Sequence, residues 1–303
     1  MDIANPPRRH RILHLSDTHV TGSGFDEDGV DAAAALDRLL HDVRHVTDID
    51  LVVVSGDIAD DGSEAGCQAV LDRVGRFAAE RGIPHVYTTG NHDDREAFAA
   101  VLGTGHRGAD GTDVGRLAAD VDGERAAASD VAGLRVITLD SLIPGSVEGV
   151  ISDAQLAWLR AELTEPTPAG SIVTFHHPPV FWDRSPWMPP FVLQNPEALA
   201  AVLAGADVRA VLCGHVHLQL SGLLAGVPVS VTPGIVTRID MTAPPQLVRG
   251  VKGAGASVVD LGGPFSPMIH TVHSRDPEAG EQVYVVDPLS WTVVTEETAY
   301  DAV

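Results

Sequence analysis

The sequence predicts an α/β fold with a sheet of parallel strands, and two observations support this prediction. Apolar, strand-like runs alternate with segments of helical periodicity up to about residue 212. The run L-V-V-V at 51–54 is apolar and rich in β-branched residues, which is typical of a strand buried on both faces. Polar residues follow this run and four others like it, and α/β proteins place their sites at the carboxyl ends of parallel strands. We therefore expect a functional site where these strands end.

The elements of the first two thirds of the chain can be placed from the same patterns. Strands are expected at 11–15, 51–54, 84–89, 134–139, 171–175 and 208–212. Apolar residues at helical spacing predict helices at 31–46, 63–81, 94–102, 152–163 and 197–203. Ser63 and Ser152 are suited to cap two of these helices, and Gly82 is suited to end one. The section 103–129 is poor in large apolar residues, so we expect an irregular surface excursion there.

The pattern changes after residue 217, where short β-type runs are separated by glycine and proline. These runs lie at 222–231, 257–261, 269–273 and 282–286, with no strong helical pattern between them. We expect them to form a second, largely antiparallel sheet packed on the first. The chain is predicted to be one domain over residues 1–303, with a chemistry-bearing part at 11–217 and a mostly β part at 218–303.

A proline-broken segment at 178–196 carries several large apolar residues, namely Phe181, Trp182, Trp187, Met188 and Phe191. So many large apolar groups in a loop indicate either a lid over a site or an interface, such as that of a homodimer. A loop packed into the core is an equally good interpretation. If the segment lies over the site, Trp182, Trp187 and Phe191 offer a stacking surface for a flat ligand.

Composition and charge narrow the class of partner. The chain has 42 acidic residues against 20 Lys and Arg, a formal net charge of −22, which disfavours a surface for DNA or RNA. Lys252 is the single lysine, so an anionic substrate needs positive charge from another source. Cys67 and Cys213 make no disulfide framework, and no apolar run approaches the length of a membrane span. We expect a cytoplasmic protein with no transmembrane segment.

The polar residues at the strand ends are of the types that bind divalent metals. They are Asp17, His19, Asp57, Asn91, His92, His176, His177, His215 and His217. The D-x-H and H-x-H spacings let two side chains at one strand end reach the same cavity. One such spacing is common by chance, but five clusters that each follow a strand are not. The oxygen and nitrogen ligands suit Mn, Fe, Zn or Co and exclude a thiolate site, since Cys213 is expected inside its strand.

Five motifs resemble the signature of the calcineurin-like metallophosphoesterases. They are D-T-H (17–19), G-D-x-x-D (56–60), G-N-H-D (90–93), H-H-P-P (176–179) and G-H-V-H (214–217), within a match that spans about 11–217. The sequence is similar in particular to the bacterial class III cyclic nucleotide phosphodiesterases, which share G-N-H-D-D-R. The resemblance implies a four-layer α/β/β/α sandwich of two mixed β-sheets flanked by helices, with two metal ions between the loops of the sheets.

The resemblance also implies a role for each matching residue. The ligands implied for one ion are Asp17, His19 and His217. Those implied for the other ion are Asn91, His176 and His215, with Asp57 bridging both. His92 is implied to face the leaving group, as an acid or as a stabiliser of phosphoryl charge, and to contact the substrate together with Asn91 and His217. His177 either supports the site from behind or supports only its own loop.

General chemistry agrees with these implied roles. Two divalent ions clamp a bridging water, lower its pKa and hold the phosphoryl oxygens, so that the hydroxide attacks phosphorus in line with the leaving alcohol. The ions also supply the positive charge that this acidic chain lacks. His92 needs a partner on its second ring nitrogen, and the sequence offers Asp60 or Asp93 for that role.

Three functions remain open from the sequence. The first is a phosphodiesterase that acts on 3′,5′-cyclic nucleotides or on related small phosphodiesters. The second is another hydrolase with the same machinery, either a glycerophosphodiesterase or a phosphomonoesterase. The third is a metal-binding scaffold without turnover, which the complete set of implied ligands disfavours. The residues that line the pocket decide between the first two, and we expect them in 22–29, 178–196 and the C-terminal part.

Overall fold

The computed structural model describes residues 8–294 apart from positions 24, 27, 120, 289 and 291, and its strands form three sheets. The first sheet has six strands in the order β15-β14-β1-β2-β3-β4. These strands are β1 (His10–Leu15), β2 (Leu51–Ser55), β3 (His85–Thr88), β4 (His106–Arg107), β14 (Gly255–Leu261) and β15 (Met268–His273). Strands β1, β2 and β3 are parallel and the other three pair antiparallel, so the sheet is mixed.

The second sheet is also mixed and has seven strands in the order β10-β11-β9-β8-β7-β6-β5. These strands are β5 (Arg116–Leu117), β6 (Ala127–Val131), β7 (Leu134–Thr138), β8 (Gly170–Thr174), β9 (Val208–Cys213), β10 (Leu220–Leu224) and β11 (Val227–Val231). Four antiparallel strands form a third, smaller sheet. They are β12 (Arg238–Ile239), β13 (Val248–Val251), β16 (Gln282–Asp287) and β17 (Thr292–Val293).

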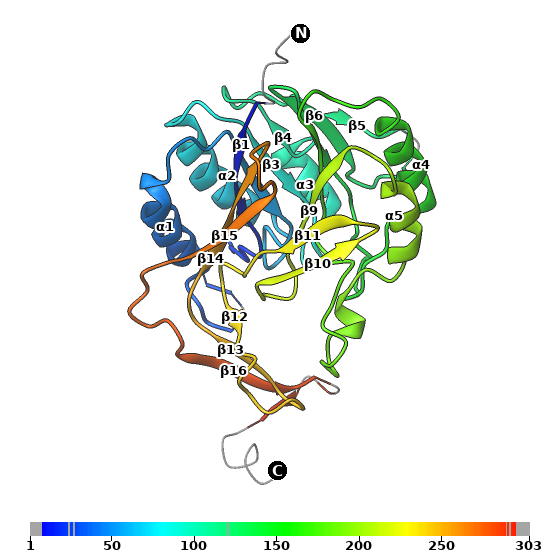
Figure 1. The fold of residues 1–303 in the computed structure, drawn as a ribbon. Coiled ribbons are helices and arrows are strands. Elements are labelled where there is room, and N and C mark those ends of the chain that lie inside the picture. Colours follow the sequence, from blue (N-terminus) through cyan, green and yellow to red (C-terminus); the bar gives the residue numbers. More distant parts are fainter. Residues whose placement is uncertain are drawn as a thin grey trace.

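Helices cover the outer faces of the two large sheets (Figure 1). The first sheet carries α1 (Ala32–Asp42) with the 3₁₀ turn η1 (Val43–His45), α2 (Glu64–Ala79) and α3 (Arg95–Leu102). The second sheet carries α4 (Asp153–Glu162) and α5 (Pro196–Leu203), preceded by the 3₁₀ turn η2 (Pro189–Phe191). One apolar cluster lies between each helix layer and its sheet, and a third lies between the sheets. The predicted four-layer sandwich is confirmed.

Strand β2 is buried on both faces, as its apolar run predicts. Val52 and Val54 point toward the helix layer, whereas Leu51 and Val53 point toward the second sheet. Two helices start at the predicted caps. Ser63 accepts a hydrogen bond from the backbone N of Gly66 at 3.0 Å, and Ser152 accepts one from the backbone N of Gln155 at 3.2 Å. Local sequence and tertiary burial therefore agree in this part of the chain.

Two expectations about the sheets are wrong. The C-terminal strands do not form the second sheet, because β14 and β15 extend the first sheet while β10 and β11 extend the second. Among the described C-terminal strands, only β12, β13, β16 and β17 form a sheet of their own. The section 103–129 is not wholly irregular either, since it contains β4, β5 and the start of β6, with Ala126, Ala127 and Ala128 fully buried. The search for large apolar residues missed this core segment because most of its buried apolar residues are alanines.

The segment 178–196 divides between core and surface. Trp187, Met188 and Phe191 are buried in the cluster that packs under α4 and α5, whereas Phe181 and Trp182 are 43% and 46% exposed. The core interpretation thus holds for the second half of the segment.

The structure also shows the state of the two cysteines and the length of the helices. Cys67 and Cys213 are buried, unpaired thiols, and burial raises the pKa of both, so neither is a reactive thiolate. Cys213 lies inside β9, as expected. Among the described residues, no helix is both long and apolar enough to cross a membrane.

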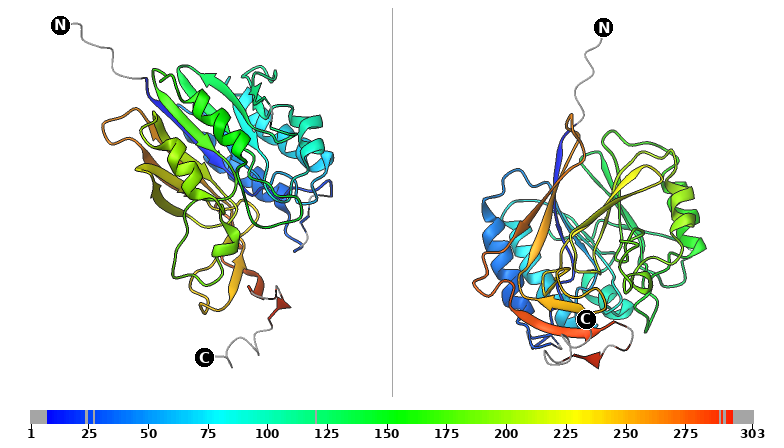
Figure 2. Two further views of the ribbon diagram at one scale, coloured as in Figure 1. Left: turned by 90° about the vertical axis from the view of Figure 1, so that its right-hand side faces the viewer. Right: turned by 60° about the horizontal axis from the view of Figure 1, so that its bottom comes forward.

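The third sheet lies across one end of the sandwich, beyond the carboxyl end of β1 (Figures 1 and 2). The segment that leads into it is hydrogen-bonded to the loop after β1, because the backbone N of Ile235 donates to the backbone O of Ser16 at 3.2 Å. The third sheet is therefore attached beside the strand ends at which the sequence predicts a site.

Candidate metal centre

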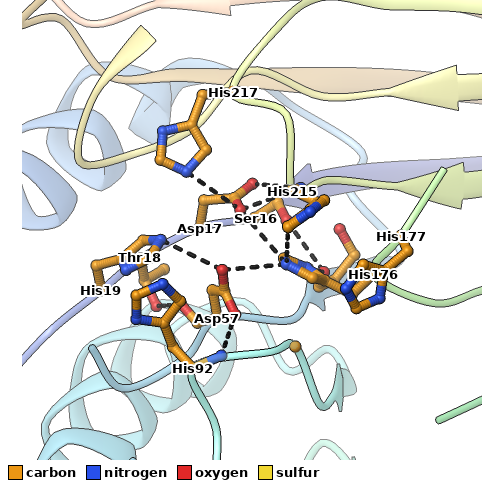
Figure 3. A network of polar contacts seen from close by, with 12 residues as sticks. Ser16, Asp17, Thr18, His19, Asp57, His92, His176, His177, His215 and His217 are labelled. Atoms are coloured by element: carbon orange, nitrogen blue, oxygen red, sulfur yellow. Dashed lines mark hydrogen bonds and ion pairs between the residues drawn. The ribbon is translucent and has the colours of Figure 1, made fainter. Parts of the chain in front are cut away.

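The loops that follow β1, β2, β3, β8 and β9 meet at one end of the sandwich and carry the predicted residues. Figure 3 shows the convergence of Asp17, His19, Asp57, His92, His176, His177, His215 and His217. Asn91 precedes His92 and lines the same pocket. The structure thus brings all nine predicted residues together, although they are spread over residues 17–217 of the sequence.

Five of these residues have a positive φ, which is uncommon for residues other than glycine. They are Asp17 (55°), His19 (44°), Asp57 (48°), His215 (74°) and His217 (49°). Each D-x-H or H-x-H pair therefore enters the site from a tight turn, and not by alternation along a strand as the sequence suggested. Strain of this kind costs roughly 1–3 kcal/mol per residue and concentrates at functional sites.

Two motif glycines allow the loops to approach one another closely. A Cβ on Gly56 would overlap the ring of His176, and a Cβ on Gly90 would overlap the carboxylate of Asp57. The loops are also joined through their backbones, since the N–H of His19 donates to the O of Asp57 at 3.0 Å. The glycines of G-D-x-x-D and G-N-H-D are thus required by the packing of the site.

Asp57 lies at the middle of the cluster. Its Oδ2 is 3.1 Å from Nε2 of His176 and 3.4 Å from Nε2 of His19, and its Oδ1 accepts a hydrogen bond from the backbone N of His92 at 2.9 Å. Three groups have ligand atoms within 4.8 Å of one another: Asp17–His19–His217, His19–Asp57–His92 and Asp57–His176–His215. Asp57 and His19 each belong to two of these groups, and Asp57 offers two carboxylate oxygens.

Asp17 is the second buried carboxylate of the cluster. Its two oxygens accept hydrogen bonds from the backbone N of His215 at 3.0 and 3.1 Å. Its Oδ1 lies 3.4 Å from Nε2 of His217. Asp17 thus ties the loop after β1 to the loop after β9.

The outer ring nitrogen of three histidines is held by an oxygen, which directs the other nitrogen into the cluster. The pairs, each 2.8 Å between Nδ1 and oxygen, are His19 with Oδ1 of Asp60, His176 with O of Ser55, and His217 with Oγ1 of Thr237. Metal-binding histidines in proteins are usually oriented in this way. Two of these partners carry no signal in the sequence, because Ser55 acts through its backbone and Thr237 lies outside the motifs.

Four polar atoms of the nine residues are buried without a hydrogen-bond partner among the described residues. One is Nε2 of His177, behind the cluster, and the other three are Nε2 of His19, Oδ1 of Asn91 and Nε2 of His215. Leaving such an atom unpaired costs about 1–3 kcal/mol. In its neutral form each of these last three residues offers at that atom a lone pair of the kind that coordinates a divalent cation, and all three line the same pocket. The residues present therefore fit a bound metal.

The carboxylates and histidines shift one another's pKa values. Burial alone would lower the pKa of His19 and of His176, but the neighbouring carboxylates outweigh it and raise each pKa to about 9. Burial alone would raise the pKa of Asp17, but His217 and His176 lower it to about 2. In the absence of a bound cation, protons on His19 and His176 therefore balance the negative charge of the carboxylates. A metal ion has to displace these protons in order to bind.

His92 lines the pocket from the loop after β3, and Asp60 provides its partner. Nδ1 of His92 donates to the backbone O of Asp60 at 3.0 Å, so Nε2 is the nitrogen left for the pocket. Asp93 was the other candidate partner for His92, but its carboxylate is engaged by backbone nitrogens. Its carboxylate accepts hydrogen bonds from the backbone nitrogens of Ile58, Ala59 and Gly90. Asp93 thus clamps the loops after β2 and β3 together.

His177 lies behind the cluster. Its Nδ1 is 2.7 Å from Oγ of Ser141, and its ring packs against those of His176 and His215, with ring centroids 5.1 and 4.4 Å apart. This position favours support of the site over support of the local loop alone.

A pocket of about 470 Å³ opens in front of the cluster. Beyond the cluster itself, its lining includes Asp26, Asp28, Phe191, Tyr284 and Val286, which come from the three regions expected from the sequence. No lysine or arginine is present among the described lining residues.

The expected stacking surface is partly wrong. Phe191 lines the pocket, but Trp182 and Trp187 do not. Trp187 is instead buried in the core, where its ring packs against that of Phe191. The sequence did not single out Tyr284, because an isolated tyrosine in a β-type run carries no functional signal.

Comparisons with known proteins agree with this geometry. Residues 10–219 match the family model described as calcineurin-like phosphoesterase. A probable cyclic nucleotide phosphodiesterase of Rhodococcus erythropolis is 38% identical over 291 residues, covering 94% of this chain and 88% of that protein. A cAMP/cGMP dual specificity phosphodiesterase of Mycobacterium tuberculosis is 36% identical over 262 residues, covering 85% of this chain and 77% of that protein. The crystal structure of TT1561 of Thermus thermophilus has a similar fold, with a TM-score of 0.53 at 15% identity, covering 88% of this chain and 100% of that one.

Proposed function

The chain belongs to the calcineurin-like phosphoesterase family and is a phosphodiesterase, and we propose that it hydrolyses 3′,5′-cyclic nucleotides with two bound metal ions. The observation that carries this proposal is the set of buried ligand atoms of His19, Asn91 and His215 that have no hydrogen-bond partner, around two buried carboxylates. The relatives named for cyclic nucleotides cover most of this chain, which supports the choice of substrate.

The proposed ligands fall into two sets that share one carboxylate. The first set is Asp17, His19 and His217. The second set is Asn91, His176 and His215. We assign Asp57 to both sets, because its Oδ2 lies 3.4 Å from Nε2 of His19 in the first set and 3.1 Å from Nε2 of His176 in the second. The oxygen and nitrogen atoms of these ligands suit Mn, Fe, Zn or Co.

The chain's own residues orient the substrate and move a proton. When bound, the two ions supply a nucleophile at neutral pH and positive charge for the phosphoryl oxygens. His92 has its Nδ1 fixed by Asp60, so its Nε2 is the atom that passes a proton to the leaving alcohol. Asn91 and His217 line the pocket with His92, and we place these three residues around the phosphoryl group.

The pocket favours a small diester with a single charge. Its volume of about 470 Å³ lies in the range of roughly 300–1,000 Å³ that is usual for small-molecule sites. The described lining offers no fixed cation, and it includes Asp26 and Asp28, so a second phosphate group would find no positive partner outside the proposed metal centre. A cyclic nucleotide meets both conditions.

Location and assembly are also proposals. Two unpaired, buried cysteines are compatible with the reducing cytoplasm, where we place the protein. We treat residues 1–303 as one domain, because the segment before the third sheet is hydrogen-bonded to the loop after β1. A homodimer that buries Phe181 and Trp182 is tested by the mass of the protein in solution.

Hydrolysis rates of the purified, Mn²⁺-loaded protein on a substrate panel test the proposed function. The panel contains 3′,5′-cyclic AMP, 3′,5′-cyclic GMP, glycerophosphoethanolamine and p-nitrophenyl phosphate. We expect the highest kcat/KM on a cyclic nucleotide. A higher kcat/KM on glycerophosphoethanolamine or on p-nitrophenyl phosphate would assign the second class of function, and no turnover at all would assign a scaffold.

A further inference from the structure

The third sheet provides one wall of the pocket. Tyr284 and Val286 on β16 both line it, and residues two apart on a strand share one face of the sheet. Phe191 lines the pocket as well, with its ring 5.7 Å from that of His215 between centroids. We call Phe191, Tyr284 and Val286 the apolar wall. It places aromatic surface beside the candidate metal centre.

Tyr284 has room for its ring because its neighbour across the sheet is a glycine. Gly250 on β13 pairs with Tyr284 on β16, and a Cβ on Gly250 would overlap carbons of the tyrosine ring. The ring therefore lies against the backbone of β13. Glycine weakens a strand interior by itself, and its presence there often marks a close approach. A residue without a Cβ at position 250 is thus needed for the Tyr284 ring to occupy this position.

Hydrogen bonds tie the apolar wall to the loops of the candidate metal centre. The backbone N of Ile239 on β12 donates to the O of His217 at 3.2 Å, and the backbone N of Val236 donates to the O of Asp17 at 3.2 Å. Strand β12 pairs with β13, and β13 pairs with β16. A continuous chain of backbone contacts therefore sets how far Tyr284 lies from the proposed ligands.

Resting on the proposed function, we infer that Tyr284, seated on Gly250, determines specificity by packing against the base of the substrate. The metal centre contacts phosphorus and its oxygens, which are alike in all small diesters. Discrimination has to come from residues that contact the alcohol part. An aromatic face stacks on any base, but it gains little from a flexible alcohol such as glycerol. The apolar wall therefore selects diesters whose alcohol part carries a planar ring.

Two variants and two matched controls test this inference in the Mn²⁺-loaded, full-length protein. Tyr284→Ala removes the ring, and Gly250→Ala displaces it without changing any residue that lines the pocket. Tyr284→Phe keeps the ring, and Gly263→Ala adds a methyl group where nothing lies within 4 Å. The measurements are KM and kcat for 3′,5′-cyclic AMP, the metal content, and the melting temperature.

We expect both test variants to raise KM for 3′,5′-cyclic AMP by about tenfold, the size of a lost base-stacking contact. Because the ring does not touch the reacting atoms, kcat at saturation should stay within about twofold, and the metal content should not change. Both controls should behave as the unaltered protein does.

An unchanged KM in Tyr284→Ala would overturn the inference, and so would a loss confined to kcat. If Gly250→Ala does not fold, the comparison of Tyr284→Ala with Tyr284→Phe decides. The proposed function fails separately, since in that case the unaltered protein would not turn over cyclic nucleotides at all, and the inference would fall with it.

Discussion

The candidate metal centre and the apolar wall face the same pocket but are built in different ways. The centre consists of short turns at the ends of five strands of the two large sheets, with positive φ angles and motif glycines that allow close packing. The wall consists of ordinary strand residues of the third sheet, together with Phe191. We therefore expect the two regions to determine different properties of the enzyme. Changes in the centre should alter metal content and kcat, whereas changes in the wall should alter KM.

The largest expected effect is that of Asp57→Ala. This change removes the carboxylate that we propose as a ligand of both ions, so both ions should bind more weakly. We expect activity to fall by more than the roughly 10²–10³-fold that the loss of one electrostatic contact costs. Metal analysis and turnover of Asp57→Ala and Asn91→Ala, measured in parallel, provide the check. If Asn91→Ala loses more metal than Asp57→Ala, the shared ligand is not Asp57.

A smaller effect within the centre is expected for His92→Ala. Its metal content should stay near that of the unaltered protein, because the proposed ligand sets do not include His92 and its Nε2 is assigned to the leaving alcohol. The rate on diesters with poor leaving groups should fall by ~10²–10⁴-fold, as is usual for the loss of a general acid. The loss should shrink with a p-nitrophenolate leaving group, which needs little protonation. Equal losses on both kinds of substrate would indicate binding of the phosphoryl group instead.

The pH dependence of the metal-free protein tests the candidate metal centre alone. His19 and His176 have a pKa of about 9 in the fold against an ordinary value of 6.5, so protonation stabilises the fold. That stability is fully present below pH 6.5 and is lost as the pH rises through about 9. Mn²⁺ has to displace the same protons, so its affinity should increase with pH over this window. Denaturant unfolding after EDTA treatment and Mn²⁺ titrations from about pH 6 to 9 measure both trends. An affinity that does not change with pH would contradict the protonated state of the cluster.

The smallest effect is expected for Trp182→Ala. Trp182 is exposed and does not line the pocket, so KM for a cyclic nucleotide should stay within about twofold of the unaltered value, as for most surface changes. Steady-state kinetics beside Tyr284→Ala gives the comparison. A KM that rises as much in Trp182→Ala as in Tyr284→Ala would move the specificity surface from the third sheet to the segment 178–196.

The residues that meet at the candidate metal centre could be predicted from the sequence because the signals for them are local. A buried strand followed by a polar turn can be recognised at each motif, and parallel strands bring such turns to one edge. The hydrogen bonds that orient the histidines could not be predicted from the sequence in the same way. Thr237 and the backbone O of Ser55 orient two histidines, but neither residue type has a spacing that indicates this role.

The wall was not predictable to the same degree, because its parts come together only through tertiary pairing. The third sheet joins residues 238–239, 248–251, 282–287 and 292–293, and nothing local separates these strands from β14 and β15. The regions that line the pocket could be named, but Tyr284 could not be distinguished from other tyrosines. Its contact with Gly250 depends on the register between β13 and β16.

Electron paramagnetic resonance of the Mn²⁺-loaded protein, with elemental analysis of the same sample, tests the two-metal centre most directly. If Asp57 bridges two ions, the sample should hold two manganese ions per chain, and its spectrum should show an exchange-coupled pair. The coupled spectrum should be lost in Asp57→Ala and kept in Tyr284→Ala. One ion per chain, or two ions with the uncoupled six-line spectrum of isolated Mn²⁺, would contradict a shared carboxylate at Asp57.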